Sequence, residues 1–511
     1  MDKFLKTLTE INSAINDFVW VKTGLIILIG TGILLTCCTG FFQVTHLRHW
    51  WRETIGSVFR KNNSSTKKTD KQTISQFQAL CTALAATIGT GNIAGVSAAI
   101  VLGGPGAVFW MWAAAFFGMM TNFSENVLGI YYRRRNSRNE WSGGAMYYLE
   151  DGLGSKIRNK TIGKILGIIF SICAILASFG IGNMGQINKI TLNIHSAFFA
   201  DIEFPEIGGV SVVNIVIGVV LMIIAAMIII GGLQRIAAVA EHIVPFMAVL
   251  YVVGCIVVFC IHINNVGNIF ASIFKFAFGV KAASGAVVGI TIKQVITQGC
   301  KRGVFSNEAG LGSSVMVHSS SNVKEPVRQG MWGIFEVFFD TFVVCTMTAV
   351  VVLSSGYIDL ETGLAVQGVN DSTLVATAFG NVFGRAGEIF IALAMLLFAF
   401  TTVLGWSQYG TKAVEYMFGE KATPVYKVIF VLMIISGAVM TSSLAWDISD
   451  TFNGMMMIPN LIGVLALFPL VSKITKNYID RKLHGKDIEP ILSFDKEIQK
   501  QTAEQIKNGE Q

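Results

Sequence analysis

The stretch Ala85-Ala-Thr-Ile-Gly-Thr-Gly-Asn-Ile-Ala-Gly95 places three glycines, two threonines and an asparagine inside a segment that is otherwise apolar enough to cross a bilayer. Each glycine weakens a helix by about 1 kcal/mol relative to alanine, so this cluster favours local unwinding. Unwound backbone at membrane depth is tolerated only where it lines a buried site or a watery cavity. Broken helices of this kind hold substrates and ions in transporters. The alternative is a face of small residues that packs against another helix.

The rest of the chain is equally apolar. Of its 511 residues, 52% are hydrophobic and 14% are charged, and the mean hydropathy is +0.59. Soluble domains carry about 25% charged residues, so this composition predicts an all-α polytopic membrane protein. A spanning helix needs about 20 apolar residues. Eleven segments meet that criterion, at 19–41, 77–103, 106–131, 162–194, 210–230, 242–262, 283–318, 331–355, 388–413, 426–445 and 449–471.

The basic residues predict how the chain crosses the bilayer. The loops 47–71 and 133–160 are rich in Lys and Arg, whereas 200–209 has neither and 356–387 has only Arg385. Cytoplasmic loops carry the excess of basic residues, so the first two loops should face the cytoplasm. With eleven spans, the N-terminus is then outside and the C-terminus inside a plasma membrane, here a bacterial inner membrane. The net charge of +7 reflects this bias and not nucleic-acid binding.

A second glycine-rich interruption, Gly299-Cys-Lys-Arg-Gly-Val-Phe-Ser-Asn-Glu-Ala-Gly-Leu-Gly-Ser-Ser314, divides the seventh segment. Setting aside the first span, the others form two groups of five, and each group opens with its broken helix. Because five is odd, the groups enter the membrane in opposite senses, which predicts an inverted repeat with the site at its interface. The predicted regions are an extra helix and cytoplasmic loop (1–76), two five-helix repeats (77–262 and 263–472) and a cytoplasmic tail (473–511). Within the second repeat, 268–280 is expected to be interfacial.

The first break presents groups of opposite polarity at one place. Backbone N–H groups at Thr90, Gly91 and Asn92 would form the positive end of a helix dipole, which favours a carboxylate. Carbonyl groups before the break would be freed for a cation, with side-chain oxygen atoms nearby. The cation ligands that this predicts are Ala85, Thr87, Ile88 and Asn92. The eight cysteines and seven histidines show no metal-ligand spacing, so we expect neither a structural metal nor a cofactor.

These motifs resemble the alanine or glycine:cation symporter family. The resemblance covers residues 4–471, and its most specific stretches are Ala86-Thr-Ile-Gly-Thr-Gly-Asn-Ile-Ala-Gly-Val96, Leu102-Gly-Gly-Pro-Gly-Ala-Val-Phe-Trp-Met-Trp112, Gly303-Val-Phe-Ser-Asn-Glu-Ala-Gly-Leu-Gly312, Pro326-Val-Arg-Gln-Gly330, Asp340-Thr-Phe-Val-Val-Cys-Thr346 and Leu404-Gly-Trp-Ser407. It implies sodium-driven uptake of small neutral amino acids on a leucine-transporter-like 5+5 inverted repeat with one extra N-terminal helix. We expect the chain to function as a monomer.

The resemblance also implies where the amino acid binds. Its carboxylate would sit on Thr90 and Gly91, and its ammonium group on carbonyl groups of the second break. The carbonyl ligands so implied are Phe305, Ser306 and Asn307. In Gly182-Asn-Met-Gly-Gln186, the side chain of Gln186 would bond the substrate or position the gate, and an ordinary interhelical hydrogen bond is the alternative. Trp406 would wall the pocket, although tryptophan is more commonly an anchor at the membrane interface.

A sodium cradle is predicted in the ninth span, at Phe398-Ala-Phe-Thr-Thr402. The carbonyl of Phe398 and the hydroxyls of Thr401 and Thr402 lie at i, i+3 and i+4, on one helical face. Together with the carbonyls of Ala85 and Ile88 they would offer the oxygen ligands that hard cations prefer. The alternative is that both threonines bond back to their own helix.

Acidic residues near the second break supply further candidates. Asp340 lies within an apolar span and should therefore face the bundle interior with a partner, either as part of a cation site or gate with Thr341 or in a structural role. Glu308 would brace the second break beside Lys301 or Arg302. The stretch Ser313-Ser-Val-Met-Val-His318 departs from the family's commoner alanine- and proline-rich pattern, so Met316 and His318 put the substrate's identity in doubt.

The sequence therefore predicts symport of sodium with alanine, glycine or a related amino acid such as glutamine, by alternating access across the lipid bilayer. The alternative within the same class is proton coupling or amino-acid exchange, with Asp340 or Glu308 as the titrating group. A channel is disfavoured because the sequence has neither a repeated filter loop nor an Arg-rich voltage helix. A membrane-embedded enzyme is disfavoured because HExxH, GxSxG and P-loop motifs do not occur.

Overall fold

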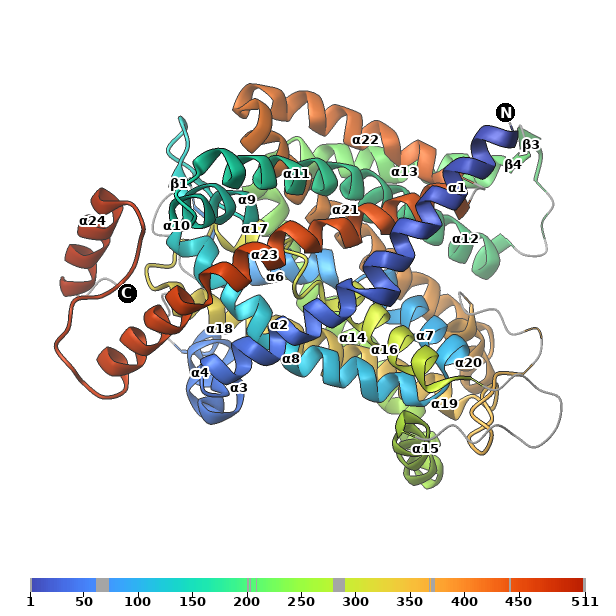
Figure 1. The fold of residues 1–511 in the computed structure, drawn as a ribbon. Helices are drawn as coiled ribbons and strands as arrows, with labels where there is room; N and C mark the ends of the chain where they lie inside the picture. Colours follow the sequence, from blue (N-terminus) through green and yellow to red (C-terminus); the bar gives the residue numbers. More distant parts are fainter. Residues whose placement is uncertain are drawn as a thin grey trace.

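The computed structural model describes residues 2–60, 73–199, 202, 204–207, 209–278, 290–366, 368, 373–440 and 443–508. About four fifths of these residues lie in helices (Figure 1). Two short antiparallel ribbons connect helices, with Arg134 opposite Ser142 in the first and Glu206 opposite Ser211 in the second. The strands are β1 (Arg134–Arg135), β2 (Trp141–Ser142), β3 (Glu206–Ile207) and β4 (Val210–Ser211).

The chain before the first broken helix forms one long helical segment and three short helices. In Figure 1 the long segment crosses the front of the bundle, and the short helices lie together at one end of it. Lys61, Lys67, Lys68 and Lys71, which contribute to the predicted orientation, lie outside the described residues. The helices of this part are α1 (Asp2–Asp17), η1 (Phe18–Lys22), α2 (Gly24–Cys38), α3 (Phe42–Thr45), α4 (Leu47–Glu53) and α5 (Ile55–Val58).

The next group of helices contains the first break. Helix α6 begins with a capping box between Ser75 and Gln78 and ends at Thr87, and its axis bends by 55° before α7. Helix α8 coincides with the predicted span 106–131, and α11, η4 and α12 make one continuous segment. The elements are α6 (Gln76–Thr87), η2 (Gly91–Gly95), α7 (Val96–Gly103), α8 (Gly106–Tyr131), α9 (Ala145–Tyr147), η3 (Tyr148–Leu153), α10 (Gly154–Lys156), α11 (Lys160–Phe179), η4 (Gly180–Met184), α12 (Gly185–Phe199), α13 (Val212–Ile229) and α14 (Gly232–Ile261).

The second break separates α16 from α17. Residues 283–289 of the predicted seventh span lie outside the described residues, and its helix runs from Ile292 to Asn307. Glu308 then adopts the left-handed conformation, as do Gly310 and Gly312, so the helix cannot continue. The elements are η5 (Ile263–Asn265), α15 (Val266–Phe278), α16 (Ile292–Asn307), α17 (Val315–His318), α18 (Pro326–Val337), η6 (Phe338–Cys345), α19 (Thr346–Ser354), α20 (Leu374–Phe383), α21 (Arg385–Phe418), η7 (Glu420–Ala422), α22 (Thr423–Val439), α23 (Ser443–Lys482) and α24 (Lys496–Lys507).

Among the described residues, eight helical segments are long and apolar enough to cross a membrane, or nine if the bent pair of α6 and α7 is one span. Helix α8 has 26 residues, enough at 1.5 Å per residue to cross as well, but Asn122, Glu125 and Asn126 lower its hydropathy. The number of eleven spans therefore stays a prediction, as do the domain boundaries and the sidedness. The predicted boundary at residue 472 falls inside α23, which continues to Lys482.

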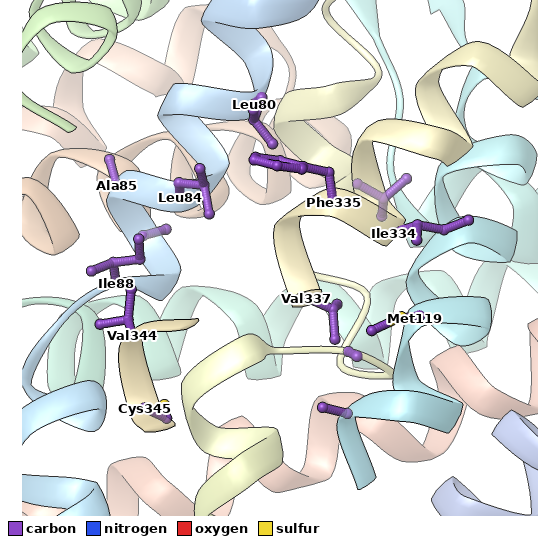
Figure 2. Close-up of a cluster of buried hydrophobic side chains, with 14 of the residues drawn as sticks. Leu80, Leu84, Ala85, Ile88, Met119, Ile334, Phe335, Val337, Val344 and Cys345 are labelled. Carbon is purple, nitrogen blue, oxygen red and sulfur yellow. The ribbon is translucent and has the colours of Figure 1, made fainter. Parts of the chain in front are cut away.

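The centre of the bundle is a tightly packed apolar core around α6. Figure 2 shows Leu80 and Leu84 of α6 pointing toward Phe335 of α18, and Ile88 beside Val344 of η6. Helix α6 also packs against α14 and α21, and α8 packs against α16 and α18. In Figure 1, α6 lies in the middle of the bundle. This packing fixes the end of α6, and hence the first break, in the middle of the protein.

Candidate functional site

The two breaks meet each other directly. Ile88, which follows α6, has an extended backbone with φ −78° and ψ 90°, and helical structure resumes at Gly91. A Cβ atom placed on Gly91 would lie 3.3 Å from Cδ1 of Phe305 and 3.5 Å from Cα of Ser306, near the end of α16. Glycine at this position therefore lets the beginning of η2 approach the C-terminal end of α16 closely, and helix ends of opposite partial charge face one place.

A cavity lies at this meeting point, and its outline encloses about 280 Å³, including space that is open to solvent. Trp406 is 2% exposed and forms part of the cavity wall, so it is not an anchor at the membrane interface. Most of the other residues that line the cavity are also among the site residues predicted from the sequence. The cavity is lined by Ala86, Thr87, Gly89, Gly91, Ile181, Gln186, Phe305, Glu308, Thr402, Trp406 and Asn453.

Gln186 connects the third segment of the bundle to the first break. Its Oε1 accepts a hydrogen bond from the backbone N–H of Thr90 at 3.3 Å, and its Nε2 donates to the carbonyl of Ile181 at 3.1 Å. Gln186 therefore makes the interhelical bond that was one of its two predicted roles, and it also faces the cavity. The backbone N–H group of Thr90, which is expected to bind the substrate carboxylate, donates its hydrogen bond to Gln186.

The predicted sodium cradle brings oxygen atoms of α21 next to the first break. The Thr402 hydroxyl lies 3.0 Å from the carbonyl oxygen of Phe398 and 3.4 Å from that of Ile88. The Thr401 hydroxyl lies 2.9 Å from the same Phe398 oxygen and 3.5 Å from Sδ of Met247. Both threonines thus bond to their own helix, and Thr402 also reaches the break.

Two residues of α6 complete the predicted set. Ala85 is fully buried within the core (Figure 2). The Thr87 hydroxyl faces the carbonyl oxygen of Leu84 at 3.5 Å, and the residue lines the cavity. Thr87 therefore bonds within α6 and lies beside the cavity, and its role as a cation ligand stays a prediction.

Asp340 joins both breaks in a hydrogen-bonded cluster and is fully buried. Its Oδ1 accepts from Nδ2 of Asn92 at 2.6 Å, and its Oδ2 accepts from Ser306 at 2.8 Å and from Thr341 at 3.0 Å. The amide of Asn307 donates to the hydroxyl of Thr341 at 3.0 Å. Ser306 binds the carboxyl group of Asp340 directly, and Asn307 is connected to it through Thr341.

Asn92 also fixes the shape of the first break. Its Oδ1 accepts from the backbone N–H of Gly89 at 2.9 Å, which closes the unwound turn. Its carbonyl oxygen accepts from the hydroxyl of Thr348 at 2.7 Å. The side chain of Asn92 thus replaces the backbone hydrogen bonding that the broken helix loses at this point.

The prediction that Glu308 lies beside Lys301 or Arg302 was wrong. Its Oε2 accepts from the hydroxyl of Ser313 at 2.5 Å, within the second break itself. Lys301 instead pairs with Asp450 of α23 at 2.9 Å, and the guanidinium group of Arg302 lies 6.0 Å from the centre of the Phe305 ring. The side chains of Lys301 and Arg302 lie one to two turns earlier on α16, whereas the left-handed turn at Glu308 directs its carboxyl group toward the cavity.

Known proteins resemble this chain in sequence and in fold. A model of the sodium:alanine symporter family matches residues 5–491. The chain belongs to the sodium:alanine symporter family. It is 41% identical over 476 residues to the "Sodium/alanine symporter AgcS" of Methanococcus maripaludis, covering 93% of this chain and 98% of that relative. It is 35% identical to the "Probable sodium/glutamine symporter GlnT" of Bacillus subtilis, covering 92% and 91% of the two chains.

The fold of this family member is also found in a solved structure. The crystal structure of MhsT in complex with L-phenylalanine matches with a TM-score of 0.52 at 14% identity, covering 80% of this chain and 99% of that chain. This confirms the predicted all-α, leucine-transporter-like fold. As a member of a symporter family, the chain is a multi-pass membrane protein that transports amino acids with a cation, and it is not an enzyme.

Several polar residues of this symporter that surround the site were missed in the sequence. Asn453 of α23 lines the cavity, and Cys345 lies 3.3 Å from the hydroxyl of Ser306. Glu125 and Glu336 are buried acids of α8 and α18. An acid inside an apolar segment is a signal of function, and it could have identified both. Cys345 lies within the motif 340–346 that carries the family resemblance, whereas Asn453 has no such signal, because its place depends on how distant helices pack.

Proposed function

We propose that this symporter couples the entry of sodium to the uptake of a small neutral amino acid, with alanine or glycine as the first candidates. The observation that carries the proposal is the cavity between the two broken helices, where the beginning of η2 faces the end of α16. A zwitterion has one charge for each of these helix ends. Alternating movement of the two halves around the cavity would expose it to each side of the membrane in turn.

The carboxylate of the amino acid would bind the backbone N–H groups at Thr90 and Gly91. Because Gln186 Oε1 accepts from Thr90 at 3.3 Å, a substrate carboxylate would take over this hydrogen bond. The side chain of Gln186 would then be free to turn toward the substrate. The ammonium group would face the carbonyl groups at the C-terminal end of α16, with the carboxyl group of Glu308 beside it.

Sodium would bind where Thr402, Phe398 and Ile88 bring their oxygen atoms together. The hydroxyl of Thr402 lies within 3.4 Å of both carbonyl oxygens, so a small inward adjustment would place all three around a hard cation. The carboxyl group of Asp340 with the hydroxyls of Ser306 and Thr341 forms a second oxygen-rich place, directly between the breaks. A cation there would compensate a buried carboxylate, which is costly when it has no counter-charge.

The walls of the cavity would limit the size of the side chain. Trp406 and Phe305 are large and rigid, and Ile181 closes a third side. A Cβ atom at Gly182 would overlap the indole ring of Trp406, so this ring cannot move back toward η4. We therefore expect the site to favour substrates with the side chains of glycine and alanine over those with aromatic side chains.

A competition assay tests the assignment of the substrate. Uptake of labelled alanine into proteoliposomes, driven by an inward sodium gradient, is measured with an excess of unlabelled glycine, alanine, glutamine or phenylalanine. We expect glycine and alanine to reduce uptake of the label by more than about tenfold, and phenylalanine to leave it nearly unchanged. Strong competition by phenylalanine would contradict the proposed role of Trp406. Competition by glutamine alone would replace alanine with glutamine as the substrate.

A further inference from the structure

A second buried polar centre lies outside the cavity, where α17 packs near α18. His318 Nε2 lies 2.9 Å from Oε2 of Glu336, and His318 Nδ1 lies 2.6 Å from Nε2 of Gln329. Because an amide nitrogen only donates, Nδ1 of His318 is the acceptor and Nε2 carries the proton that is donated to Glu336. All three side chains are fully buried. In this arrangement Glu336 accepts one hydrogen bond from the imidazole of His318.

Only one of the two carboxyl oxygens of Glu336 has hydrogen-bond partners among the described residues. Its Oε2 also faces Nδ2 of Asn122 at 3.4 Å, but its Oε1 has no hydrogen-bond partner among the described residues. Asn122 Nδ2 in turn reaches the hydroxyl of Ser314, and Asn122 Oδ1 accepts from Asn126 at 2.6 Å. A fully buried carboxylate oxygen without a donor is unfavourable, whereas a protonated carboxyl group has no charge to compensate.

Acidic groups nearby make a negative charge on Glu336 still less favourable. Glu125 of α8, Glu308 at the second break, Asp340 of η6 and the phenol group of Tyr409 on α21 all lie near enough to interact electrostatically with Glu336. In the part of the chain that the structure describes, no ion pair joins Glu336 to a lysine or arginine. The groups around Glu336 are therefore acidic or neutral.

The other elements packed against α18 bring no compensating charge to Glu336. Helix α6 carries only one titratable side chain, that of Cys81. The charged groups contributed by α4 and α23 lie at the opposite end of α18, where Glu53 faces Arg328 at 3.7 Å and Arg481 pairs with Glu325 at 2.7 Å.

We propose that His318 and Glu336 form a buried proton-binding site, separate from the amino-acid cavity, whose occupation stabilises the closed form of the bundle end near Arg133. One proton bound to the pair removes the uncompensated charge. The proton would be released when water reaches the pair. The transported ligand remains the amino acid with its cation, and the proton is an additional ligand.

Hydrogen bonds connect this pair to that end of the bundle. The hydroxyl of Ser321 donates to Oε1 of Gln329 at 3.1 Å, and the carbonyl oxygen of Ser321 accepts from Arg133 at 2.7 Å. Arg133 also bonds the carbonyl oxygen of Ser319 at 3.3 Å, and its guanidinium group lies 3.9 Å from the centre of the Trp141 ring. Opening this clamp would move the segment that follows α17 and let water approach His318.

Infrared difference spectroscopy of the purified full-length protein tests the bound proton without relying on transport. A protonated carboxylic acid in an apolar environment has a carbonyl stretching band that a carboxylate lacks. Glu125, Glu308 and Asp340 are also buried and can give bands of this kind, so the test is the difference between the two proteins. We expect the wild-type protein to lose, as the pH is raised, one carbonyl band that is missing from the Glu336→Gln variant at every pH. His318→Gln should shift the band, because it changes the donor to Oε2. Identical pH difference spectra for wild type and Glu336→Gln would overturn the proposal.

Transport supplies the second readout, and only this part of the test rests on the proposed function. With saturating sodium, uptake by the wild type should fall as the pH on both sides rises, by at most about tenfold per pH unit for one proton. Uptake by Glu336→Gln should depend on pH less steeply than uptake by the wild type. The matched controls are Glu361→Gln, on an exposed turn, and His262→Gln, at the end of α14. Both controls should keep the wild-type profile.

The two readouts separate the possible failures. If no amino acid is taken up but the infrared band depends on Glu336, the proposed substrate is wrong and the proton site stands. If uptake occurs and Glu336→Gln keeps the wild-type pH profile, the link between the proton and closure is rejected. If Glu336→Gln does not fold, as judged by gel filtration in detergent, two other variants, Glu336→Asp and His318→Gln, replace it. A carbonyl band at the wild-type position in both variants would overturn the proposal.

Discussion

Asn92 is the residue on which the geometry of the site depends most. It bonds the backbone of Gly89 in its own break, the carboxyl group of Asp340 and the hydroxyl of Thr348. All of these groups are buried, so each lost bond leaves a polar atom without a partner. The side chain of Asn92 therefore shapes the first break and connects it to η6, and the backbone carbonyl of the same residue connects the break to α19.

Replacement of Asn92 by alanine should reduce sodium-driven uptake at least about tenfold, equivalent to ~1.4 kcal/mol. The unwound turn would lose the bond at Gly89, and Asp340 would lose a donor. Insertion into the membrane should persist, because the apolar segments are unchanged. Asn268→Ala is the matched control, since this asparagine is exposed on α15. Initial rates in proteoliposomes at equal protein content measure the effect, and wild-type sodium affinity in Asn92→Ala would reject the assignment.

Thr402 and Thr401 should differ in their contribution to sodium binding. Thr402 reaches the carbonyl of Ile88, whereas Thr401 reaches Met247. We expect Thr402→Val to raise the half-saturating sodium concentration about fivefold, or ~1 kcal/mol. Thr401→Val should have a smaller effect, and the variant with Thr401→Ala and Thr402→Val the largest. Thr31→Val, a buried threonine of α2 that bonds only its own helix at 2.7 Å, is the control. Equal sodium affinity in all four proteins would remove the threonines from the site.

At the scale of elements, glycines set how closely the segments approach around the cavity. A Cβ atom at Gly182 of η4 would overlap Trp406 of α21, and one at Gly405 would lie 2.6 Å from Cβ of Ala86 on α6. Such distances cannot be accommodated without movement of a helix or a side chain. The positions of η4 and α6 against α21 therefore depend on residues that lack a side chain.

Gly182→Ala should narrow the cavity by displacing the indole ring of Trp406. We expect uptake of alanine to fall about tenfold relative to uptake of glycine, because overpacking typically costs about 1–3 kcal/mol and the larger substrate bears more of it. Gly30→Ala is the control, since a Cβ atom there meets nothing within 4 Å. The ratio of the two uptake rates is the measurement, and an unchanged ratio would show that Trp406 does not limit substrate size.

The segment after α17 is held by Arg133, which bonds three carbonyl groups including that of Val323 at 2.5 Å. Arg133→Lys keeps the charge but cannot reproduce the planar fork. We expect maleimide to label a Ser320→Cys reporter about tenfold faster in this variant, because the segment opens more often. Exposed Cys37, Cys38 and Cys260 are first replaced by serine. Arg235→Lys, on the exposed end of α14, should leave the labelling rate unchanged. Equal rates in both variants would show that Arg133 does not hold this segment closed.

At the scale of the whole molecule, the sequence predicts features that depend on local pattern. The span 106–131 agrees with α8 because Gly104 and Pro105 precede its first residue and Tyr132 ends it. The two breaks could be located because glycine and polar residues interrupt apolar runs. Their meeting at Gly91 and Phe305, more than 200 residues apart in the chain, was expected from the inverted repeat and from the family resemblance and not from any local pattern.

Tertiary packing determines which buried polar side chains contact each other, and the sequence pattern does not predict these pairs. The polar residues of α8 give no sign of their partners, yet Asn122 contacts Glu336 of α18 and Glu125 contacts Asn460 of α23. Glu308 was expected beside Lys301, but the left-handed turn directs it elsewhere. Such pairings follow from the angles at which helices cross, and apolar periodicity does not encode them.

The energetic requirement of uptake concerns the molecule as a whole. One positive charge moving inward gains about 2.3 kcal/mol per 100 mV. A tenfold sodium gradient adds ~1.4 kcal/mol. Together these terms support accumulation of a neutral amino acid by a hundredfold or more. Coupling requires that both ligands bind the same conformation, which the short distance between the cavity and the Thr402 oxygen cluster allows.

The most direct test of sodium coupling is uptake of labelled alanine and glycine into proteoliposomes, with an inward sodium gradient compared against choline at matched pH and voltage. We predict accumulation above the external concentration with sodium, and only equilibration or no uptake with choline. Equal accumulation in sodium and choline would contradict sodium coupling and make protons or exchange the driving process.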